Sequence, residues 1–236
     1  MAYQQYLNRF GRSEDEIAAV AVTFREHAML NENAIMREPL TVEEYLNSRY
    51  ICRPLRVYDC SLVNDGGACV ILRRADRSHD LRHPPILVAG VGRHGNYRHH
   101  TQMRFRMIDE CWENLRFASS RCFEMARLTT ADVDVFQCHD GYSFHVPLNL
   151  EGFGFCNPGE GPDYVQSGRI ALRGELPCNT SGGLLSESFM HGMNLHIEAV
   201  RQLRHDAGAR QVEGAATAMY CHHGHWGALC MLYERA

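Results

Sequence analysis

Side chains that could do chemistry gather in four short stretches of the chain. The first, HDGYSF (139–144), places a histidine and an aspartate directly after VDVFQC (133–138), a run that predicts a core strand. Ligands and catalytic groups collect at strand ends in α/β proteins, which makes His139 a candidate site residue. A structural alternative stays open: Asp140 caps the next helix, and His139 is an ordinary loop residue.

The second stretch, NTSGGLLSESFMHGMN (179–194), has two glycines between a polar turn and a predicted helix. The backbone N–H groups of such a turn can bind an anion. The stretch matches neither a P-loop, which needs a lysine, nor the GxGxxG pattern. From these residues alone, a packing turn between a strand and a helix is the favoured interpretation.

The third stretch, CHHGHWGALC (221–230), holds a cysteine and three histidines, which are ligand types for zinc or copper. Neighbouring residues on a strand point to opposite faces, so these four side chains converge only if the segment is a loop. A tight turn between the last two strands explains the pattern at least as well. The fourth stretch, RHGNYRHH (93–100), is predicted to be a loop, with contact to a phosphate or CoA group as the functional alternative.

The composition excludes several classes of function. The chain has 236 residues, is 45% hydrophobic and 22% charged, and carries a net charge of -4 with a pI near 6.4. Such a chain is long enough for one large domain or two small ones, and its charge does not favour nucleic-acid binding. All 24 basic residues are arginine, so a lysine Schiff base is excluded.

The location is predicted from what the sequence lacks. The N-terminal stretch MAYQQYLNRFGRSEDE has no apolar segment of the signal-peptide kind, and no apolar run reaches the ~20 residues of a membrane span. The ten cysteines form no CxxC pair. Reduced, intracellular thiols are therefore expected, and the predicted location is cytoplasmic.

Periodicity and capping signals predict the elements that would position these stretches. Helices are expected at Ser13–Met29, after Thr41, at Arg104–Arg127, after HDGYSF and at Ser186–His205. Strands are expected at 55–59, 68–72, 85–92, 133–138, 215–221 and 227–233. The run at 85–92 is almost wholly apolar, which is typical of a strand covered on both faces. The alternation of strands and helices from residue 133 predicts an α/β fold with helices packed on a sheet.

Three of these motifs, by their order and spacing, resemble the thiolase superfamily. HDGY resembles the H-D-x-F of its sterol-carrier-protein-x and lipid-transfer-protein thiolase-like branch, NTSGGLLS the N-P-S-G-G-L-x-S, and CHHGHWGA the terminal C-x-G-G-G-x-G-A turn. The resemblance implies an α/β, thiolase-like fold, layered αβα with a mixed sheet and an incomplete first half. It divides the chain into a helical loop region of the first half (1–53), the closing strands of that half (54–93) and a C-terminal thiolase-like domain (94–236).

The resemblance also assigns roles to residues. The part of the family that carries the nucleophilic cysteine has no counterpart here, and the family's loop histidine aligns with Phe189. His191 lies two residues later, and on a helix this turns the side chain by about 200°, so it cannot simply replace that histidine. His139 matches a histidine beside the thioester oxygen, and Cys221 matches a cysteine that acts as acid and base at the α-carbon. The expected substrate-binding residues are Asn179, Ser181, Gly182, Gly183, Phe189 and Gly224, and no metal ligands are expected.

The function that the resemblance implies is that of an enzyme, or enzyme subunit, acting on a carbon–carbon bond of an acyl-CoA. Without a nucleophile no acyl-enzyme forms, so we expect retro-aldolase-type chemistry on a β-hydroxy- or β-ketoacyl-CoA rather than ordinary thiolysis. His139 would stabilise the thioester enolate, and Tyr142, His191 or Cys221 would transfer the proton. The CoA thioester is the expected substrate, and no bound cofactor is expected.

Two alternatives stay open. The chain is a noncatalytic, truncated or partner-dependent thiolase-like subunit, or it is a metal-dependent hydrolase built on CHHGH. A missing half would expose apolar interface, so an oligomer is expected. It would be a homodimer, or a hetero-oligomer with a zinc-ribbon/OB-fold protein of the kind that members of this branch use. No nucleic-acid partner and no membrane span are expected.

Overall fold

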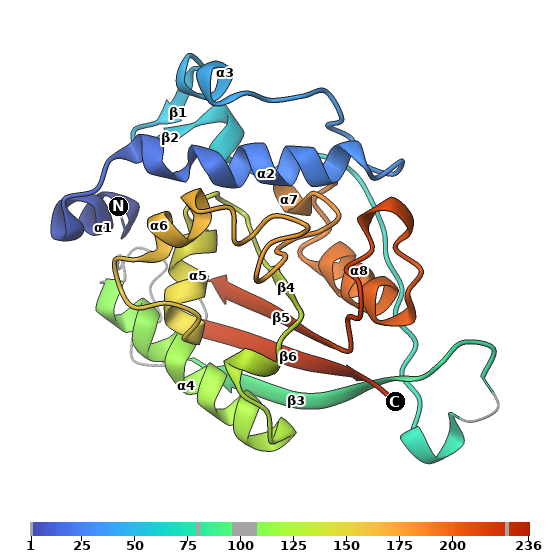
Figure 1. Cartoon of the computed structure of the whole chain (residues 1–236). Helices are drawn as coiled ribbons and strands as arrows, with labels where there is room; N and C mark the ends of the chain where they lie inside the picture. The colour runs from blue at the N-terminus through green and yellow to red at the C-terminus, as the bar shows by residue number, and fades with distance from the viewer. Residues whose placement is uncertain (1, 79–80, 96–107, 225–226) are drawn as a thin grey trace.

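The structure is a computed structural model that describes residues 2–78, 81–95, 108–224 and 227–236. Its elements run from an N-terminal helix to a C-terminal strand (Figure 1). In chain order they are α1 (Ala2–Phe10), η1 (Glu14–Ile17), α2 (Ala18–Met29), α3 (Val42–Leu46), β1 (Tyr50–Cys52), β2 (Leu55–Arg56), η2 (Val57–Asp59), η3 (Ala75–Arg77), β3 (Ile86–His94), α4 (Ile108–Ala126), η4 (Thr130–Asp132), β4 (Val135–Cys138), α5 (His145–Phe153), α6 (Gly161–Gln166), α7 (Gly183–Ser186), α8 (Met193–Arg204), η5 (Gly208–Arg210), β5 (Thr217–Gly224) and β6 (Gly227–Arg235).

A four-stranded mixed sheet forms the centre of the fold. The strand order is β3-β6-β5-β4, with antiparallel pairing of β3 with β6 and of β6 with β5, and parallel pairing of β5 with β4. Alternate residues of β5 enter two core clusters: Met219 and Cys221 pack with α4 and α5, whereas Ala218 and Tyr220 pack with α8. Helices therefore cover both faces of the sheet, and the predicted α/β class with αβα layers and a mixed sheet is confirmed.

Side-chain caps fix where the N-terminal helices begin. Ser13 accepts a hydrogen bond from the Asp15 N–H at 3.3 Å, and η1 and α2 follow, so the predicted helix over Ser13–Met29 is confirmed with a 3-10 first turn. Thr41 Oγ1 accepts from the Glu44 N–H at 3.1 Å, while the Glu44 carboxylate accepts from the Thr41 N–H at 2.8 Å. This is the predicted capping box, and it starts α3. Neither α1 nor α6 was predicted from the sequence.

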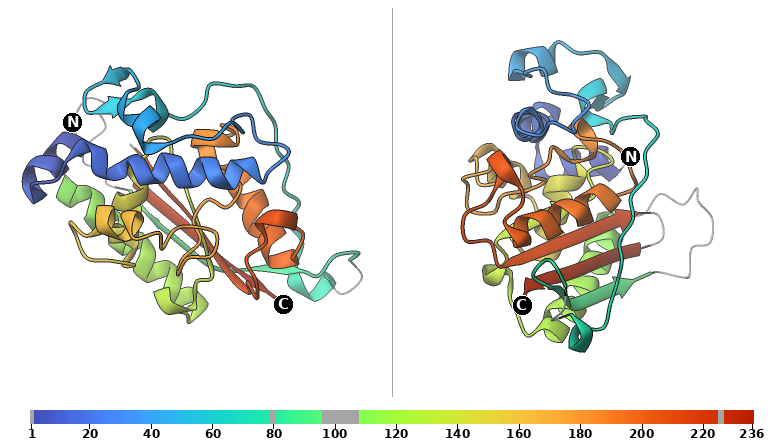
Figure 2. Two further views of the ribbon diagram at one scale, coloured as in Figure 1. Left: turned by 45° about the horizontal axis from the view of Figure 1, so that its top comes forward. Right: turned by 90° about the vertical axis from the view of Figure 1, so that its right-hand side faces the viewer.

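The predicted strand at 68–72 is wrong. Figure 2 shows the stretch between η2 and η3 running as extended chain along one side of the molecule, and none of the strands within the described ranges includes it. Ile71 and Leu72 are 89% and 79% exposed. The run has the composition of a strand, but a strand also needs a neighbour that accepts and donates its backbone hydrogen bonds. The strand predicted at 55–59 is likewise shortened to the two residues of β2.

Strand β3 confirms the strand predicted at 85–92, but it is not covered on both faces. Among the described strands it pairs only with β6, at the edge of the sheet, and Val88 and Val91 are exposed. The division of the chain into 1–53, 54–93 and 94–236 stays a prediction. Its second boundary falls inside β3, which is hydrogen-bonded to the sheet of the later segment.

Helix α4 matches the predicted helix over Arg104–Arg127 from Ile108 onward, and residues 104–107 lie outside the described residues. In the part of the chain that the structure describes, no helix is both long enough and apolar enough to cross a membrane. α4 lies directly against β3 (Figure 1). A Cβ atom on Gly92 would lie 1.8 Å from the Ala118 carbonyl oxygen, and one on Gly90 would lie 2.3 Å from that of Cys122. These two glycines therefore allow the helix backbone to touch the strand.

Replacing Gly92 by alanine is expected to lower the free energy of unfolding by more than about 2 kcal/mol, because the added methyl group overlaps the α4 main chain. Gly67→Ala is the matched control, since nothing lies within 4 Å of the added Cβ there. Its effect should stay within about 0.5 kcal/mol. Urea denaturation followed by circular dichroism measures both. Equal stability of the two variants would show that α4 moves away from β3 without cost.

Candidate active site

His139 follows the last residue of β4, and its backbone holds it at the end of the sheet. Its N–H donates to the Cys221 carbonyl oxygen at 2.8 Å, which extends the pairing of β4 with β5 by one residue. The side chain is 7% exposed, and neither ring nitrogen has a hydrogen-bond partner among the described residues. Burial, with smaller contributions from His222, His145 and His191, lowers the pKa of His139 to about 3. The imidazole is therefore neutral at pH 7, and one of its nitrogens keeps a proton that it can donate.

Three rings lie around His139, and they come from two further elements. Its ring centroid is 4.3 Å from that of His222 on β5. It is 6.2 Å from the centroids of both His191 and Phe189, in the loop between α7 and α8. The structure thus brings together three residues that the sequence predicted for the site. It adds His222, which the sequence indicated only as a metal-ligand type.

Tyr142, on the loop after β4, has 45% of its surface exposed. Its ring is 5.4 Å from that of His145, the first residue of α5, and the His145 ring is 6.3 Å from that of His223. Sequence reasoning missed His145. The available signal was its spacing of three residues from Tyr142, which places two side chains on the same face of a helical turn.

The helix predicted over Ser186–His205 is confirmed from Met193 onward as α8, but the loop that carries Phe189 and His191 is not helical. α7 ends at Ser186 and α8 begins at Met193. Between them His191 has a φ of 52° and Gly192 a φ of 87°, values that a right-handed helix does not contain. A Cβ atom at Gly192 would lie 2.3 Å from the Tyr220 hydroxyl oxygen, so only glycine fits this position. The rotation of about 200° expected between Phe189 and His191 on a helix therefore does not apply, and the two rings lie 4.9 Å apart.

Cys221 is fully buried within the sheet, and its expected role as an acid and base stays a prediction. Its register partners are Cys138 on β4 and Cys230 on β6. Burial raises the pKa of the Cys221 thiol well above its usual range. The thiol is therefore protonated at neutral pH, and it is 0% exposed. Tyr142 and His191 are the predicted proton-transfer groups that the structure leaves accessible.

Asn179 and Ser181 are buried and bonded to the protein itself. Asn179 Nδ2 donates to the Cys138 carbonyl oxygen, and its Oδ1 accepts from the Cys138 N–H, both at 2.8 Å. This amide takes the place of a strand neighbour where β4 ends. Ser181 Oγ donates to Glu187 Oε2 at 2.6 Å. Both residues are 0% exposed, so we propose that they position the site instead of contacting substrate as predicted.

The two glycines of this stretch form a packing turn, as the residues alone favoured. The N–H groups of Leu184 and Leu185, at the start of α7, donate to the Asp140 carboxyl group at 2.9 and 3.3 Å. A Cβ atom on Gly183 would lie 2.2 Å from Asp140 Oδ2, and one on Gly182 would lie 2.6 Å from the Ala28 Cβ. Asp140 therefore caps α7 and not α5. Because it accepts hydrogen bonds from the N–H groups that would bind an anion, those groups are already occupied. Burial raises the pKa of Asp140 well above its usual range.

Several predicted features reach the limits of the described residues. Gly224 ends the paired part of β5 beside residues 225–226, which lie outside the description, so its role stays a prediction. In the described ranges, no group of three or more His, Cys, Asp or Glu side chains is arranged to hold a metal ion. His225 of the CHHGH stretch lies outside those ranges, and so do residues 96–100 of RHGNYRHH.

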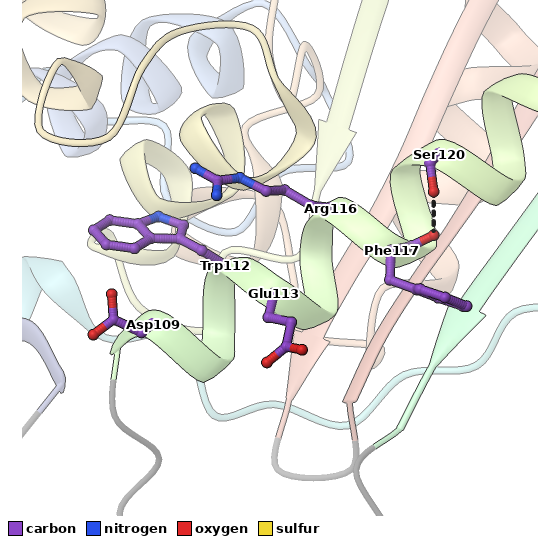
Figure 3. Close-up of a pocket in the computed structure, with 6 residues that line it drawn as sticks. All are labelled: Asp109, Trp112, Glu113, Arg116, Phe117 and Ser120. Carbon is purple, nitrogen blue, oxygen red and sulfur yellow. Dashed lines mark hydrogen bonds between the residues drawn. The ribbon is translucent and has the colours of Figure 1, made fainter.

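A surface cavity of about 550 Å³ lies along the outer face of α4. Figure 3 shows its lining residues, among which Ser120 Oγ donates to the Phe117 carbonyl oxygen at 3.0 Å. A second cavity of about 420 Å³ lies beside Arg116 and Arg169. Neither cavity is lined by any predicted site residue, so the site at His139 is defined by its side chains and not by either of these hollows.

Comparison with known proteins identifies the family. A family model described as thiolase C-terminal domain-like matches residues 96–231, so the chain belongs to this family. The resemblance to the thiolase superfamily is thereby confirmed. The chain is 32% identical over 206 residues to a steroid side-chain-cleaving aldolase from Thermomonospora curvata, covering 86% of this chain and 53% of that protein. It is 34% identical over 223 residues to an acetyl-CoA acetyltransferase from Methanothermobacter thermautotrophicus, covering 93% and 57%.

Among solved structures, this chain superposes on an Ltp2-ChsH2(DUF35) aldolase with a TM-score of 0.92 and 30% sequence identity. The superposition covers 98% of this chain and 61% of the aldolase chain. This likeness confirms the thiolase-like fold. The chain spans about half the length of the curated relatives it matches.

The two hydrogen bonds between the Asn179 side chain and the Cys138 main chain, called the Asn179 brace, can be tested by measuring stability. Asn179→Ala leaves the Cys138 N–H and C=O groups unpaired in the core, and this should lower the free energy of unfolding by about 2–4 kcal/mol. Asn33→Ala is the matched control, because Asn33 is exposed. Its effect should stay within about 0.5 kcal/mol. Urea denaturation gives both values, and a loss below about 1 kcal/mol in Asn179→Ala would mean that the brace is dispensable.

His27 of α2 supports the same loop and predicts a pH dependence. Its Nδ1 lies 3.3 Å from the Asn179 carbonyl oxygen, and burial lowers its pKa from 6.5 to about 4. Between pH 6.5 and 4 the unfolded chain binds a proton that the folded chain does not, so His27 destabilises the fold as the pH falls. The slope reaches at most about 1.4 kcal/mol per pH unit. His27→Gln should flatten the dependence of the unfolding free energy on pH across this range.

The matched control for this measurement is His83→Gln, at an exposed position. Buried carboxyl groups with a raised pKa, such as Asp140, change the unfolding free energy with pH in the opposite direction. Since they are present in both wild type and variant, the difference between the two slopes reports on His27 alone. An unchanged slope in His27→Gln would show that the folded chain protonates His27 as readily as the unfolded chain does.

Proposed function

We propose that this member of the thiolase C-terminal domain-like family belongs to an enzyme that cleaves the carbon–carbon bond of a β-hydroxyacyl-CoA by a retro-aldol reaction. The observation that carries the proposal is the neutral His139 imidazole, whose two ring nitrogens are unpaired among the described residues. The accessible His191 ring lies 6.2 Å from it, and the accessible Tyr142 lies three residues after His139 on the same loop. The relatives named as aldolases support the same class of reaction.

The reaction requires two things of the protein: a place for negative charge on the thioester oxygen and a route for protons. A base removes the proton of the β-hydroxyl group, the bond between Cα and Cβ breaks, and Cβ leaves as the carbon of a ketone or aldehyde. The bonding electrons move into the thioester as an enolate, which then takes up a proton at Cα. No oxidant and no acyl-enzyme takes part, so the reaction needs no nucleophilic cysteine.

His139 is suited to hold the thioester oxygen. A neutral imidazole donates one N–H hydrogen bond, and its low pKa keeps the second nitrogen unprotonated throughout the physiological range. Its position is fixed before substrate binds, because the backbone N–H is bonded to β5 and the ring is buried. A fixed donor in a partly dry site stabilises a developing oxyanion more than water does.

Tyr142 and His191 are placed to move the proton. His191, on the loop before α8, has its ring 6.2 Å from that of His139, and Tyr142, on the loop after β4, has its ring 5.4 Å from that of His145. We assign one of them to accept the β-hydroxyl proton and the other to deliver a proton to Cα. Phe189, half-buried beside His139, supplies an apolar wall where the family's loop histidine would stand.

Two cysteines whose backbones are paired with the loop after β4, Cys60 and Cys221, do not favour thiolysis. Cys221 is fully buried. Cys60 forms a backbone bridge with Tyr142, but its thiol donates to the Arg56 carbonyl oxygen at 3.6 Å, and burial raises its pKa. Neither arrangement presents a thiolate to a substrate at His139.

A second candidate function, a partner-dependent subunit, is favoured by one observation. The extended stretch between η2 and η3 exposes Val63, Ile71 and Leu72, each by more than three-quarters of its surface. Large apolar side chains exposed in a row mark a surface that another chain covers. We therefore propose that the chain works in a hetero-oligomer, with a partner of the DUF35 kind that the Ltp2-ChsH2(DUF35) structure names. In this proposal the CoA thioester is the substrate.

The experiment that tests the function uses the native complex, purified from its host, with every chain identified by mass spectrometry. A β-hydroxyacyl-CoA should yield a ketone or aldehyde and a shortened acyl-CoA without added free CoA. Cleavage of a β-ketoacyl-CoA that depends on free CoA would instead identify a thiolase. No cleavage of either substrate by the complete complex would contradict the proposed enzyme activity.

The role of His139 gives a sharper prediction. His139→Ala should lower kcat by about 10²–10³-fold, the usual loss for a single oxyanion donor. His139→Gln keeps a neutral N–H donor and should lose less. Because the pKa of His139 is about 3, its titration should add no inflection to the kcat profile between pH 5 and 9. His83→Gln is the control, and full activity of His139→Ala would rule out the oxyanion role.

A further inference from the structure

The segment from Asp59 to Asn64, called the strap below, connects three parts of the site. Its backbone bridges Cys60 to Tyr142, and the Ser61 N–H donates to the Gly141 carbonyl oxygen at 3.1 Å, beside His139. The strap comes from a part of the chain about 80 residues before this loop, as the separation of 84 between Asp59 and Ser143 shows. It begins where η2 ends and follows the side of the molecule (Figure 2).

The first end of the strap is anchored by Asp59, which is 0% exposed. Its carboxyl group accepts hydrogen bonds from the Tyr45 hydroxyl at 2.7 Å, from the Arg56 N–H at 2.6 Å and from the Ser143 hydroxyl. Its carbonyl oxygen also accepts from the Ser143 N–H at 2.9 Å. These bonds hold the start of the strap rigidly to the loop after β4.

The other end of the strap reaches the loop that carries Phe189 and His191. The Leu62 N–H donates to the Leu184 carbonyl oxygen at 3.0 Å, and Asn64 Oδ1 accepts from the Phe189 N–H at 2.8 Å. Two residues further on, a Cβ atom on Gly66 would lie 3.0 Å from Met190 Cγ, so this end of the segment packs closely on the same loop.

The hydrogen bond between Asn64 and Phe189 differs from the neighbouring bonds of this loop, because it joins residues that are far apart in the sequence. Ser188 and Met193 are tied to neighbours by local bonds, from the Ser188 N–H to Gly183 at 3.4 Å and from the Met193 N–H to Met190 at 3.0 Å. The Phe189 N–H, between them, is bonded to a side chain 125 residues away in the sequence. The helix on either side is interrupted by the positive φ of His191 and Gly192, so the loop lacks helical hydrogen bonds of its own here.

We infer that Asn64 is a positioning residue: its side-chain oxygen holds the Phe189 backbone and thereby sets the His191 ring beside His139, while Asp59 fixes the strap to the opposite loop. The consequence for catalysis rests on the proposed function, but the positioning itself does not. A displacement of a proton-transfer group by about 1 Å can cost about 10²-fold in rate. The Asp140 carboxyl group joins the loop after β4 to the start of α7, and the Asn64 side chain would control the position of the loop that follows α7.

The experiment compares Asn64→Leu with Asn64→Asp, which keeps an oxygen acceptor, and with Asn33→Leu, an exposed control. The first measurement is amide hydrogen exchange of Phe189 by NMR, which needs no substrate. Exchange should accelerate about tenfold or more in Asn64→Leu, and remain near wild type in Asn64→Asp and Asn33→Leu. Unchanged exchange at Phe189 in Asn64→Leu would overturn the inference, and circular dichroism confirms that each variant is folded. If Asn64→Leu does not fold, Asn64→Ala takes its place.

The second measurement separates kcat from KM in the native complex. Asn64→Leu should lower kcat by about 10–100-fold with KM changed by less than about threefold, and Asn64→Asp should stay within about threefold of wild type. Equal loss in the Leu and Asp variants would also overturn the inference, because it would mean that the acceptor is not what matters. If wild type itself shows no cleavage, the proposed function fails, and the exchange measurement still decides the positioning role.

Discussion

The hydrogen bonds between the buried Asp140 carboxyl group and the first N–H groups of α7 are the interaction on which the site depends. Asp140 follows His139 directly, and α7 leads directly into the loop of Phe189 and His191. One carboxyl group therefore joins the two segments whose side chains meet. Its approach is possible only because Gly183 has no side chain at that point. The N-terminal N–H groups of a short helix, which would otherwise be unpaired, thus connect the loop after β4 to the loop after α7.

Around the Asp140 carboxyl group, many buried polar groups are hydrogen-bonded to one another. Asn179 bonds both main-chain groups of Cys138. On the far side, Thr180 Oγ1 donates to Glu198 at 2.9 Å, and Glu198 pairs with Arg210 at 3.0 Å, both residues being buried. Unpaired polar groups in a core are costly, so such a network holds one arrangement of its loop strongly. Some buried polar atoms lack partners among the described residues, and both ring nitrogens of His139 are among them, as are both side-chain amide atoms of Asn149. An unpaired, neutral imidazole inside a rigid frame is the feature most consistent with a binding partner supplied by substrate.

The N-terminal part of the chain contributes to the site directly. Helix α2 packs on α7 (Figure 1), and its His27 contacts the Asn179 carbonyl oxygen. The strap adds bonds to the loops on both sides of His139. Beyond the strap, the chain passes into the stretch that exposes Ile71 and Leu72. One continuous segment of the chain thus contains both the strap, which is hydrogen-bonded to the site loops, and the exposed apolar side chains. A partner bound to that surface would be connected through the strap to the loops of the site.

The sequence by itself determined the family, the class of fold and most of the elements. Caps at Ser13 and Thr41 and the strands around residues 135–138, 217–224 and 227–235 were predictable, because these signals are local. The position of His139 after a strand was readable for the same reason. Only the tertiary structure decided which side chains meet. Ser186–His205 had the periodicity of one helix, but the contact of Gly192 with Tyr220 interrupts it. Residues 68–72 had the composition of a strand but have no strand partner among the described residues.

Cys221 matched a catalytic position, yet packing between two strands buries it. The partners of Asn179 and Asn64 lie 41 and 125 residues away. Local propensity acts over a few residues and can be read from the chain, whereas burial, pKa shifts and loop positions arise from such distant contacts and exist only in the folded protein.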